Sequence, residues 1–443
     1  MLNIRQHLDE ILHSEFYRNI AGLFSGIAVA RAIPALFAVV IARLYAPSDF
    51  GWFVLVLSFA SVLSIPATGG LEKALLLTGG RREKQHLMRF SLRINWRLNA
   101  VVLGFIVIYL LIDRSLSLHN QLMLVLIPVY AYFFASVQLL RNLLISNKAF
   151  KRLSVLEVFR AVAIGGLQSL FFIFPNIGLF LGIVLAHIAT YIAFTPAKER
   201  DIPVSLKRER VLARRYINFP KFSVASELLN FISSQLPVFM IKPFFGAANL
   251  GLYGFSHRYL SLPVQLTTIS IGSVYVQKAQ TLATQNEALG ILTFSLFKKQ
   301  FWLAIVPFTV LGLWGELIFG AIFGSEWAYS GKLGALMAPW LFMVFIGAPL
   351  ATILVVREKQ KISMLFNLTM LFFRAMAIVI GAYVVQDLTT TVALYSLVGF
   401  LFFTMLTGYA LHLSGVSLIR AGWFSAKTFA FVIVPFVVLK LWL

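Results

Sequence analysis

The sequence contains no cysteine, few charged residues and no long polar stretch. Charged side chains make up only 12% of its 443 residues, whereas 59% are hydrophobic. The absence of cysteine excludes disulfides and thiol chemistry. The scarcity of charge excludes an ordinary soluble domain, because such a fold could not bury this much apolar surface. Since no polar stretch is long enough for a soluble catalytic domain, the composition predicts a chain embedded in a lipid bilayer.

Energy-using and hydrolytic motifs are also missing from the sequence. It has no GxxxxGKS/T phosphate loop, no HExxH and no cluster of residues at metal-ligand spacing. We therefore expect no metal and no cofactor, and the chain alone does not resemble an ATP-driven pump. The sequence gives no sign of an enzyme.

Apolar runs recur along the whole chain, each about 20 residues long and able to cross the bilayer as a helix. We predict an all-α polytopic membrane protein with about 12 transmembrane helices. The predicted spans are 19–44, 51–77, 95–112, 120–144, 154–174, 177–195, 217–243, 251–276, 300–322, 332–355, 362–384 and 390–412. A further apolar tail at 425–443 either spans the membrane or lies along its surface.

The positive charge is distributed unevenly between the predicted loops. The chain carries 38 Lys and Arg against 17 Asp and Glu, a formal net charge of +21. Most basic residues fall in alternate loops, and the intervening loops hold only Arg43, Arg114, Lys242 and Lys332. The positive-inside rule then places the amino terminus in the cytoplasm of a multi-pass protein of the bacterial inner membrane. Topology and attraction to lipid headgroups explain the charge better than nucleic-acid binding.

An internal repeat divides the predicted helices into two halves. The segment LYAPSDFGWF at 44–53 returns as FFGAANLGLY at 244–253, so that Gly51 matches Gly251. Six spans separate the two copies, which predicts two parallel six-helix repeats around a central cavity. The expected domains are 1–196, a basic cytoplasmic linker at 197–216, 217–412, and a tail at 413–443. The alternative is two similar hairpin turns without a shared architecture.

Three arginines of the predicted spans are candidates for a transport path, because charge inside a membrane is costly and marks such a path by default. They are Arg31, Arg258 and Arg374, and we predict that they face the cavity. For Arg31 the alternative is a structural pair with a buried carboxylate. Two other charged residues, Glu157 and Arg160, stand one helical turn apart, which predicts an ion pair between them.

Polar residues at helical spacing extend this prediction to two neighbouring spans. Ser261 and Gln265 continue the face of Arg258, while Glu227 and Asn230 share a face of the preceding span. A polar face in the bilayer must meet water, substrate or another polar helix. We predict that these residues bind substrate, with interhelical packing as the alternative.

Arginine inside a membrane suits an anionic cargo. A guanidinium stays protonated, and its planar fork matches phosphate oxygens, which hydrocarbon cannot solvate. Glu227 suits a different task, because a carboxylate within the membrane can take up H⁺ or Na⁺ and couple transport to an ion gradient. Serving as counter-ion to one of the arginines is the alternative for Glu227. Lys73 is expected to extend toward the cytoplasmic surface.

Two motifs resemble a known family. ARLYAPSDFG at 42–51 and PATGGLEKAL at 66–75 are similar to the opening of polysaccharide repeat-unit flippases, which belong to the multidrug/oligosaccharidyl-lipid/polysaccharide exporter superfamily. The resemblance covers the twelve predicted helices. It implies two lobes that open alternately to each side of the membrane. It also implies a cargo, an undecaprenyl-pyrophosphate-linked repeat unit for O-antigen lipopolysaccharide, capsule or exopolysaccharide. Other membrane proteins of polysaccharide assembly are expected partners.

Related lipid II flippases keep cationic cavity residues on helices 1, 2 and 8, and Arg31 and Arg258 resemble those on helices 1 and 8. The drug-exporting branch typically has a carboxylate in helix 1, where this chain has Arg31. Two other functions remain open: a cation-coupled small-molecule exporter of the same superfamily, and a membrane glycan polymerase. The short external loops argue against the polymerase.

Overall fold

The computed structural model describes residues 15–78, 80–195, 206–282 and 286–442. Throughout these ranges the chain forms helices joined by short turns, and no strand is present in them. Contacts divide the chain into two compact units, Met1–Val238 and Phe239–Leu443, here called unit 1 and unit 2. The predicted all-α architecture is therefore confirmed, and each unit is described separately.

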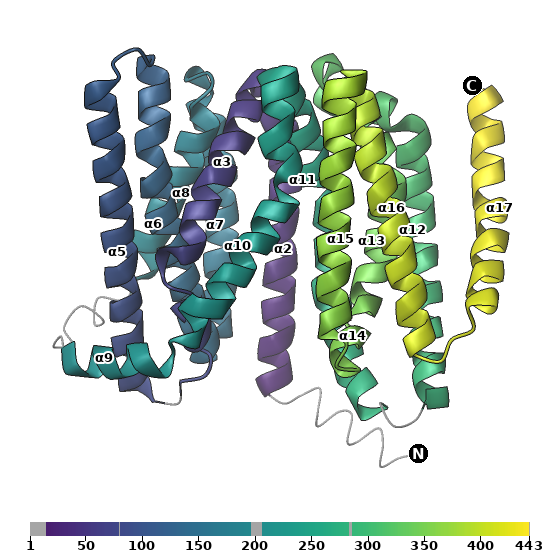
Figure 1. The fold of residues 1–443 in the computed structure, drawn as a ribbon, viewed down its shortest axis with the longest axis horizontal. Helices are drawn as coiled ribbons and strands as arrows, with labels where there is room; N and C mark the ends of the chain where they lie inside the picture. The colour runs from purple at the N-terminus through teal and green to yellow at the C-terminus, as the bar shows by residue number, and fades with distance from the viewer. Residues whose placement is uncertain (1–14, 79, 196–205, 283–285, 443) are drawn as a thin grey trace. The chain divides into compact units, whose positions relative to one another are not determined.

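Unit 1 contains the helices up to the start of α11 (Figure 1). Helix α2 packs along α7, α7 packs against α8, and α6 contacts α3, α5 and α8. The helices are α2 Glu15–Leu44, α3 Pro47–Ala67, α4 Leu71–Ala74, α5 Arg81–Ile112, α6 Leu118–Ser146, α7 Phe150–Leu170, α8 Gly178–Phe194, α9 Leu206–Arg215 and α10 Val224–Ser234.

Unit 2 is built around α13, which packs against both α12 and α16, while α15 packs on α16 and α17 on α12. The boundary between the units falls just inside the first turn of α11. The helices are α11 Leu236–Thr281, α12 Asn286–Phe323, α13 Ala328–Ala351, α14 Ile353–Val356, α15 Gln360–Val379, α16 Leu388–Leu413 and α17 Leu418–Trp442.

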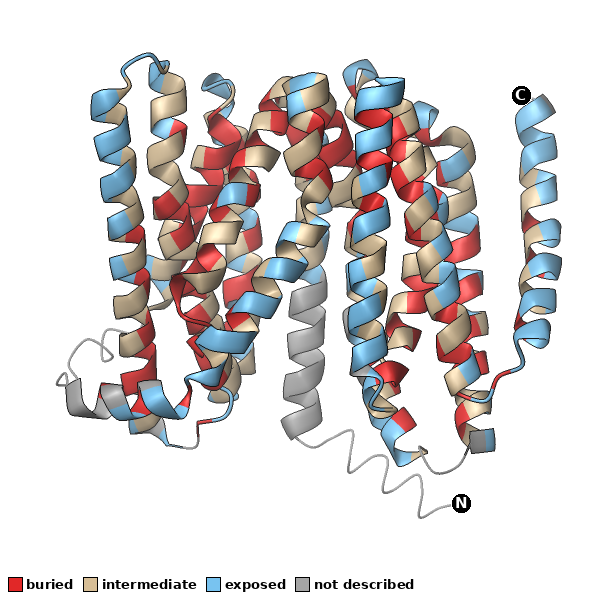
Figure 2. Cartoon of the chain, in the orientation of Figure 1, coloured by how far each residue is buried: buried red, intermediate tan, exposed pale blue. Residues whose placement is uncertain are grey.

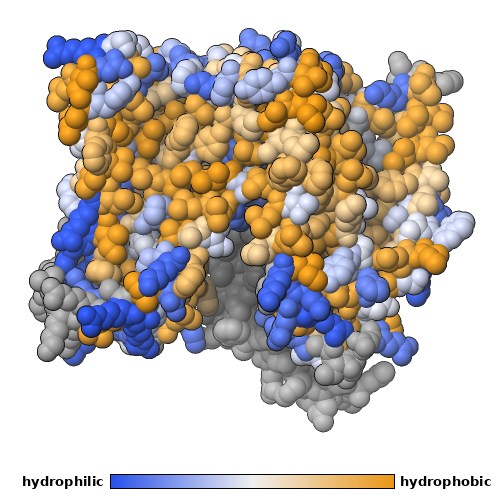
Figure 3. All heavy atoms as spheres, viewed as in Figure 1, coloured by the Kyte–Doolittle hydropathy of each residue, from blue (hydrophilic) through white to orange (hydrophobic). Residues whose placement is uncertain are grey.

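Ten helical segments of the described chain are long and apolar enough to cross a membrane, and α8 adds a shorter apolar helix. Large hydrophobic side chains such as Phe105 and Leu365 lie exposed on them. Within each unit, hydrophobic residues occupy the middle of the helices and hydrophilic residues gather toward the helix ends (Figure 3). A band of this kind fits a bilayer rather than water. The chain is thus a multi-pass membrane protein.

The predicted span 51–77 is shorter in the structure, because α3 ends at Ala67. Gly69 and Gly70 follow with φ of 65° and 70°, a left-handed conformation that favours glycine. At Gly70 a Cβ would stand 3.0 Å from the side chain of Val224, so this turn also lets α10 approach. The turn redirects the chain into α4 before α5 begins.

The two predicted spans at 217–243 and 251–276 are divided differently in the structure. A π-helical turn at Phe219–Ser223 leads into α10, and α11 then continues to Thr281. One residue interrupts α11, Gly246, with φ of 84° and ψ of 174°. This kink falls in the second copy of the repeat, where the first copy has the turn between α2 and α3.

Both copies of the repeat use an equivalent side chain at this turn. Asp49 accepts hydrogen bonds from the backbone nitrogens of Ala46, at 3.1 Å, and Asn176, at 2.7 Å. Asn249, its match in the second copy, donates to the carbonyl oxygen of Phe245 at 2.8 Å. Both matched positions thus place a polar side chain at this turn, although Asp49 accepts hydrogen bonds and Asn249 donates one.

The predicted domain boundaries at 196 and 217 differ from the division of the compact units, which falls between Val238 and Phe239. The first part of the predicted linker, 197–205, lies outside the described residues. Its second part forms α9, and the Arg93–Glu209 ion pair of 2.7 Å holds this helix on α5. The assignment of 1–196 and 217–412 to two repeats stays a prediction.

The apolar tail forms one long helix, α17, which begins earlier than predicted. Its 25 residues, Leu418–Trp442, extend about 37 Å at 1.5 Å per residue, enough to span a bilayer. Much of α17 is exposed in Figure 2. Its contact with unit 2 is aromatic: Phe424 and Phe429 pack edge-on against Phe301 of α12, with ring centroids 5.4 Å and 5.2 Å apart.

Candidate functional site

A buried glutamate in unit 1 forms ion pairs with two arginines. Glu157 of α7 is 7% exposed and accepts hydrogen bonds from Arg141 Nε at 2.8 Å and from Arg160 Nη2 at 2.5 Å. The predicted pair of Glu157 and Arg160 is confirmed. Arg141 stands at the cytoplasmic end of its predicted span, and no partner for it was predicted. Its pairing links α6 to α7.

Arg31 joins the same group, because it lies within electrostatic range of Glu157, Arg160 and Arg141. We call Arg31, Arg141, Glu157 and Arg160 the Glu157 cluster. Arg141 and Arg160 bind the carboxylate and Arg31 adds a third guanidinium within electrostatic range, so the cluster holds an excess of positive charge. Arg31 thus lies near a carboxylate that two other arginines already bind, and its role, cavity-facing or structural, stays a prediction.

Close packing of α2 and α7 brings Arg31 to this place. At Gly165 of α7 a Cβ would lie 2.2 Å from the ring of Phe37, so only glycine lets the two helices approach so closely. Further along, the hydroxyl of Tyr45 donates to the carbonyl oxygen of Gln168 at 2.7 Å. Helix α2 is therefore packed closely on α7 in the turns that follow Arg31.

A second charged group in unit 1 joins α4 to α10. Lys73 Nζ lies 2.5 Å from Glu227 Oε2, and both side chains are 43% exposed. Beside this pair, the hydroxyl of Thr68 donates to Glu72. Glu227 does form an ion pair, as one alternative predicted, but its partner is a lysine and not an arginine. Asn230, one turn further along α10, is exposed on the same helix.

The other predicted residues lie in unit 2. Ser261 donates its hydroxyl to the carbonyl oxygen of His257 within its own helix, and Gln265 is exposed on α11. Arg258 is half-buried on the same helix. Arg374 of α15 is only 8% exposed and lies against the rings of Trp340 and Tyr395. A single cavity shared by all these residues and those of unit 1 stays a prediction.

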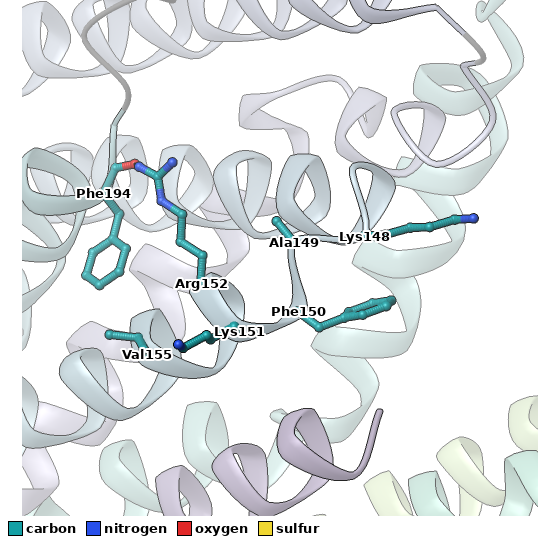
Figure 4. Close-up of a pocket in the computed structure, with 7 residues that line it drawn as sticks. All are labelled: Lys148, Ala149, Phe150, Lys151, Arg152, Val155 and Phe194. Carbon is teal, nitrogen blue, oxygen red and sulfur yellow. The ribbon is translucent and has the colours of Figure 1, made fainter. Parts of the chain in front are cut away.

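A groove of about 490 Å³ opens at the start of α7 (Figure 4). Its lining combines three cations with aromatic and aliphatic side chains: Lys148, Ala149, Phe150, Lys151, Arg152, Val155 and Phe194. Arg152 Nη2 donates to the carbonyl oxygen of Phe194 at 2.9 Å, which ties α7 to the end of α8. The amino groups of Lys148 and Lys151 point away from each other in Figure 4. This groove lies in a segment that the sequence places on the cytoplasmic side.

Two titratable groups outside the spans are shifted by their contacts. Hydrogen bonds from the backbone and hydroxyl of Thr390 lower the pKa of Asp387, which caps α16. Burial and the neighbouring carboxylate of Glu83 raise the pKa of Tyr216 at the end of α9. Within the described residues, no three His, Asp or Glu side chains stand close enough to hold a metal ion.

The fold is similar to that of solved transporters of the MOP superfamily. It is similar to the solved structure of "Lipid II flippase MurJ, inward closed conformation", with a TM-score of 0.70 and 12% identity over 94% of this chain and 92% of that one. It is also similar to an inward-facing multidrug resistance MATE family transporter of the MOP superfamily, with a TM-score of 0.59 and 13% identity over 88% and 94%. At these identities the likeness concerns the fold.

The sequence identifies the family more narrowly. A family model described as "Polysaccharide biosynthesis protein" matches residues 40–331, so the chain belongs to this family. One curated relative is the succinoglycan biosynthesis transport protein ExoT of Rhizobium meliloti (strain 1021), 29% identical over 133 residues. That match covers 29% of this chain and 26% of the relative. The resemblance drawn from the two sequence motifs is thereby confirmed.

Proposed function

We propose that this chain is a flippase for polyprenyl-pyrophosphate-linked oligosaccharides. It would move undecaprenyl-linked repeat units from the cytoplasmic to the outer leaflet of the bacterial inner membrane, for O-antigen, capsule or exopolysaccharide synthesis. Membership of a polysaccharide biosynthesis family and the MOP fold support a transporter for this purpose. The nature of the cargo is argued below from the charges of the chain.

The Glu157 cluster is the observation that carries this proposal. Pyrophosphate bears negative charge that hydrocarbon cannot solvate, so its passage needs cations inside the helical bundle. Arg141 and Arg160 already bind Glu157, and Arg31 stands beside them as the excess cation. Arginine offers paired N–H donors whose fork geometry fits phosphate oxygens. We therefore propose Arg31 as a headgroup contact, and Arg258 as its counterpart in unit 2.

Glu227 and the polar residues around it complete the proposal. Its contact with Lys73 ties α4 to α10, and partial exposure leaves the carboxylate accessible. Uptake of H⁺ or Na⁺ at Glu227 would compete with this ion pair and so couple an ion gradient to the packing of α10. Asn230, Ser261 and Gln265 are proposed contacts for the sugar, because hydroxyl-rich cargo needs such donors and acceptors.

Reconstitution of the purified chain into liposomes tests the assignment. The probe is a polyprenyl pyrophosphate carrying a labelled oligosaccharide, and a membrane-impermeant glycosidase reports which molecules have crossed. We expect protein-dependent crossing of this lipid and no uptake of cationic dyes. Dye transport with no lipid flipping would instead assign the chain to the drug-exporting branch. A product of higher molecular weight in the same liposomes would indicate a polymerase.

A further inference from the structure

Arg374 occupies a corner between two aromatic rings in unit 2. Its guanidinium carbon lies 4.4 Å from the ring centroid of Trp340 and 4.5 Å from that of Tyr395. These two rings stand nearly perpendicular, at 86°, with centroids 5.5 Å apart. The three residues come from α13, α15 and α16. We call Arg374, Trp340, Tyr395, Ser396 and Gly399 the Arg374 cage.

The charge of Arg374 is uncompensated in the described part of the chain. The ion pairs found there all lie in unit 1, and none involves Arg374. Its Nε and Nη2 atoms are buried and have no hydrogen-bond partner among the described residues. Ring faces attract a guanidinium only weakly compared with the cost of removing it from water. A buried arginine in this state calls for an anion beside it.

Two further buried polar groups stand in the same region. Trp340 Nε1 and Ser396 Oγ also find no hydrogen-bond partner within the described ranges. A Cβ at Gly399 would lie 2.4 Å from Arg374 Nη2 and 2.6 Å from Trp340 Cδ1, so both groups reach the backbone of α16 at this glycine. Ser396 lies one helical turn before Gly399 on the same face. Hydrogen-bond donors of α13, α15 and α16 therefore lie in one region, and none of them has an acceptor among the described residues.

The indole of Trp340 is held in place from its other side. His257 stacks on it with ring centroids 5.9 Å apart and an angle of 13°, and Tyr253 stacks on His257 at 5.8 Å and 7°. The stacked rings of His257 and Tyr253, both on α11, fix the direction of the indole N–H. The unpartnered donor is therefore a feature of a rigid packing arrangement and not of a mobile surface side chain.

We propose that the Arg374 cage binds a small monovalent inorganic anion of the chloride class. One fixed guanidinium balances one negative charge, and the contact with Gly399 leaves little room at the site. The positive edges of aromatic rings and the N–H and O–H donors suit a spherical halide. A pyrophosphate would need several cations and an open path, which the Glu157 cluster fits better. The anion would hold α13, α15 and α16 together by neutralising Arg374.

The thermal stability of the full-length chain in detergent tests this site. The melting temperature is measured in sodium chloride and in sodium gluconate at equal ionic strength. We expect a saturable rise of about 4 °C when chloride is in 100-fold excess over its Kd. Sodium bromide and sodium nitrate should act like chloride. A melting temperature that is the same in all these salts would overturn the proposal, because the cage would then hold no anion.

Variants locate the effect. Arg374→Gln should abolish the dependence on halide, whereas Arg420→Gln should keep it. Arg420 is a matched control because its guanidinium also lies over a ring, 4.8 Å from the centroid of Phe294, but is exposed. Halide dependence that survives Arg374→Gln would contradict the proposal.

A milder variant covers the case in which Arg374→Gln does not fold. Trp340→Phe keeps an aromatic face for Arg374 and removes only the indole donor, so we expect the Kd for chloride to rise about tenfold. An unchanged Kd in this variant would exclude the indole from the site. The last measurement uses sodium pyrophosphate in place of the halide salts. Stabilisation by pyrophosphate but not by halide would show that the cage is a headgroup site and overturn the assignment to a small anion.

Discussion

Lys73 and Glu227 form an ion pair of 2.5 Å between α4 and α10, although 154 residues separate them in the sequence. The left-handed turn at Gly70 makes this contact possible, because it lets α10 approach within van der Waals distance of α4. Both side chains are partly exposed, so the pair adds little to stability. Its position suits an ion pair that can break and form again better than a permanent one.

Neutralising Glu227 should uncouple transport from the ion gradient. In the parent chain we expect an H⁺ or Na⁺ gradient to stimulate flipping at least fivefold, roughly the lower end of typical coupling effects. Glu227→Gln should remove this stimulation, because the amide can neither bind the ion nor pair with Lys73. Flipping in liposomes with and without the gradient measures the effect. Glu316→Gln, at an exposed glutamate of α12, is the control; a gradient effect that persists in Glu227→Gln would exclude this role.

Removing the carboxylate of the Glu157 cluster should destabilise unit 1. Glu157→Gln leaves Arg141 and Arg160 without their negative partner in a buried site. Breaking a buried ion pair from one side costs about 3 kcal/mol or more. We expect a clearly lower melting temperature than for the parent chain or for Glu316→Gln. Equal melting temperatures would mean that water or lipid phosphate solvates the three arginines without help from Glu157.

Adjacent glycines of α7 test whether close helix packing positions Arg31. Gly165→Ala places a methyl group where the ring of Phe37 lies, so α2 must shift and carry Arg31 with it. At Gly166 a Cβ would meet no described atom within 4 Å, which makes Gly166→Ala the matched control. We expect Gly165→Ala to lower both flipping and the melting temperature. Equal behaviour of the two variants would show that the position of α2 does not depend on this contact.

The cap of α16 predicts a pH-dependent contribution to stability. Hydrogen bonds from Thr390 lower the pKa of Asp387 in the folded chain, so its stabilising effect is complete above the ordinary carboxyl pKa. The effect disappears as the pH falls through the lowered value. Asp387→Ala should cost about 1 kcal/mol at pH 7, a usual loss for an N-cap. Melting temperatures of both proteins should converge in acid; a constant difference at every pH would contradict this account.

The sequence predicted the helices well because hydrophobic length dominates their formation in a bilayer. It also predicted the pair of Glu157 and Arg160, since one helical turn separates them. It did not assign Arg141 to Glu157 or Lys73 to Glu227. Those contacts depend on how separate helices pack, which the spacing along one helix does not determine. The start of α17 was missed for another reason: Arg420 and Gly422 interrupt the apolar pattern before 425.

The sequence did not predict the residues that surround Arg374 either. Its position within a span suggested a cavity-facing arginine, yet the structure encloses it between Trp340 and Tyr395. The only sequence signals were two aromatic residues on other helices and Gly399, whose lack of a side chain makes room for the guanidinium. Such a cage becomes visible only when three helices are packed together. The repeat, by contrast, could be recognised from the matched sequences of its two copies, in which Gly51 aligns with Gly251.

Binding of the lipid headgroup to Arg31→Gln tests the central claim most directly. Arg31 is the arginine left over when Arg141 and Arg160 bind Glu157, so this variant removes charge while keeping both ion pairs. We predict that its affinity for polyprenyl pyrophosphate falls about tenfold or more, since a charge-assisted hydrogen bond contributes roughly 1.5–3 kcal/mol. Flipping should fall in parallel, and Arg114→Gln should match the parent chain. Unchanged affinity and flipping in Arg31→Gln would contradict the claim that this cluster solvates the pyrophosphate.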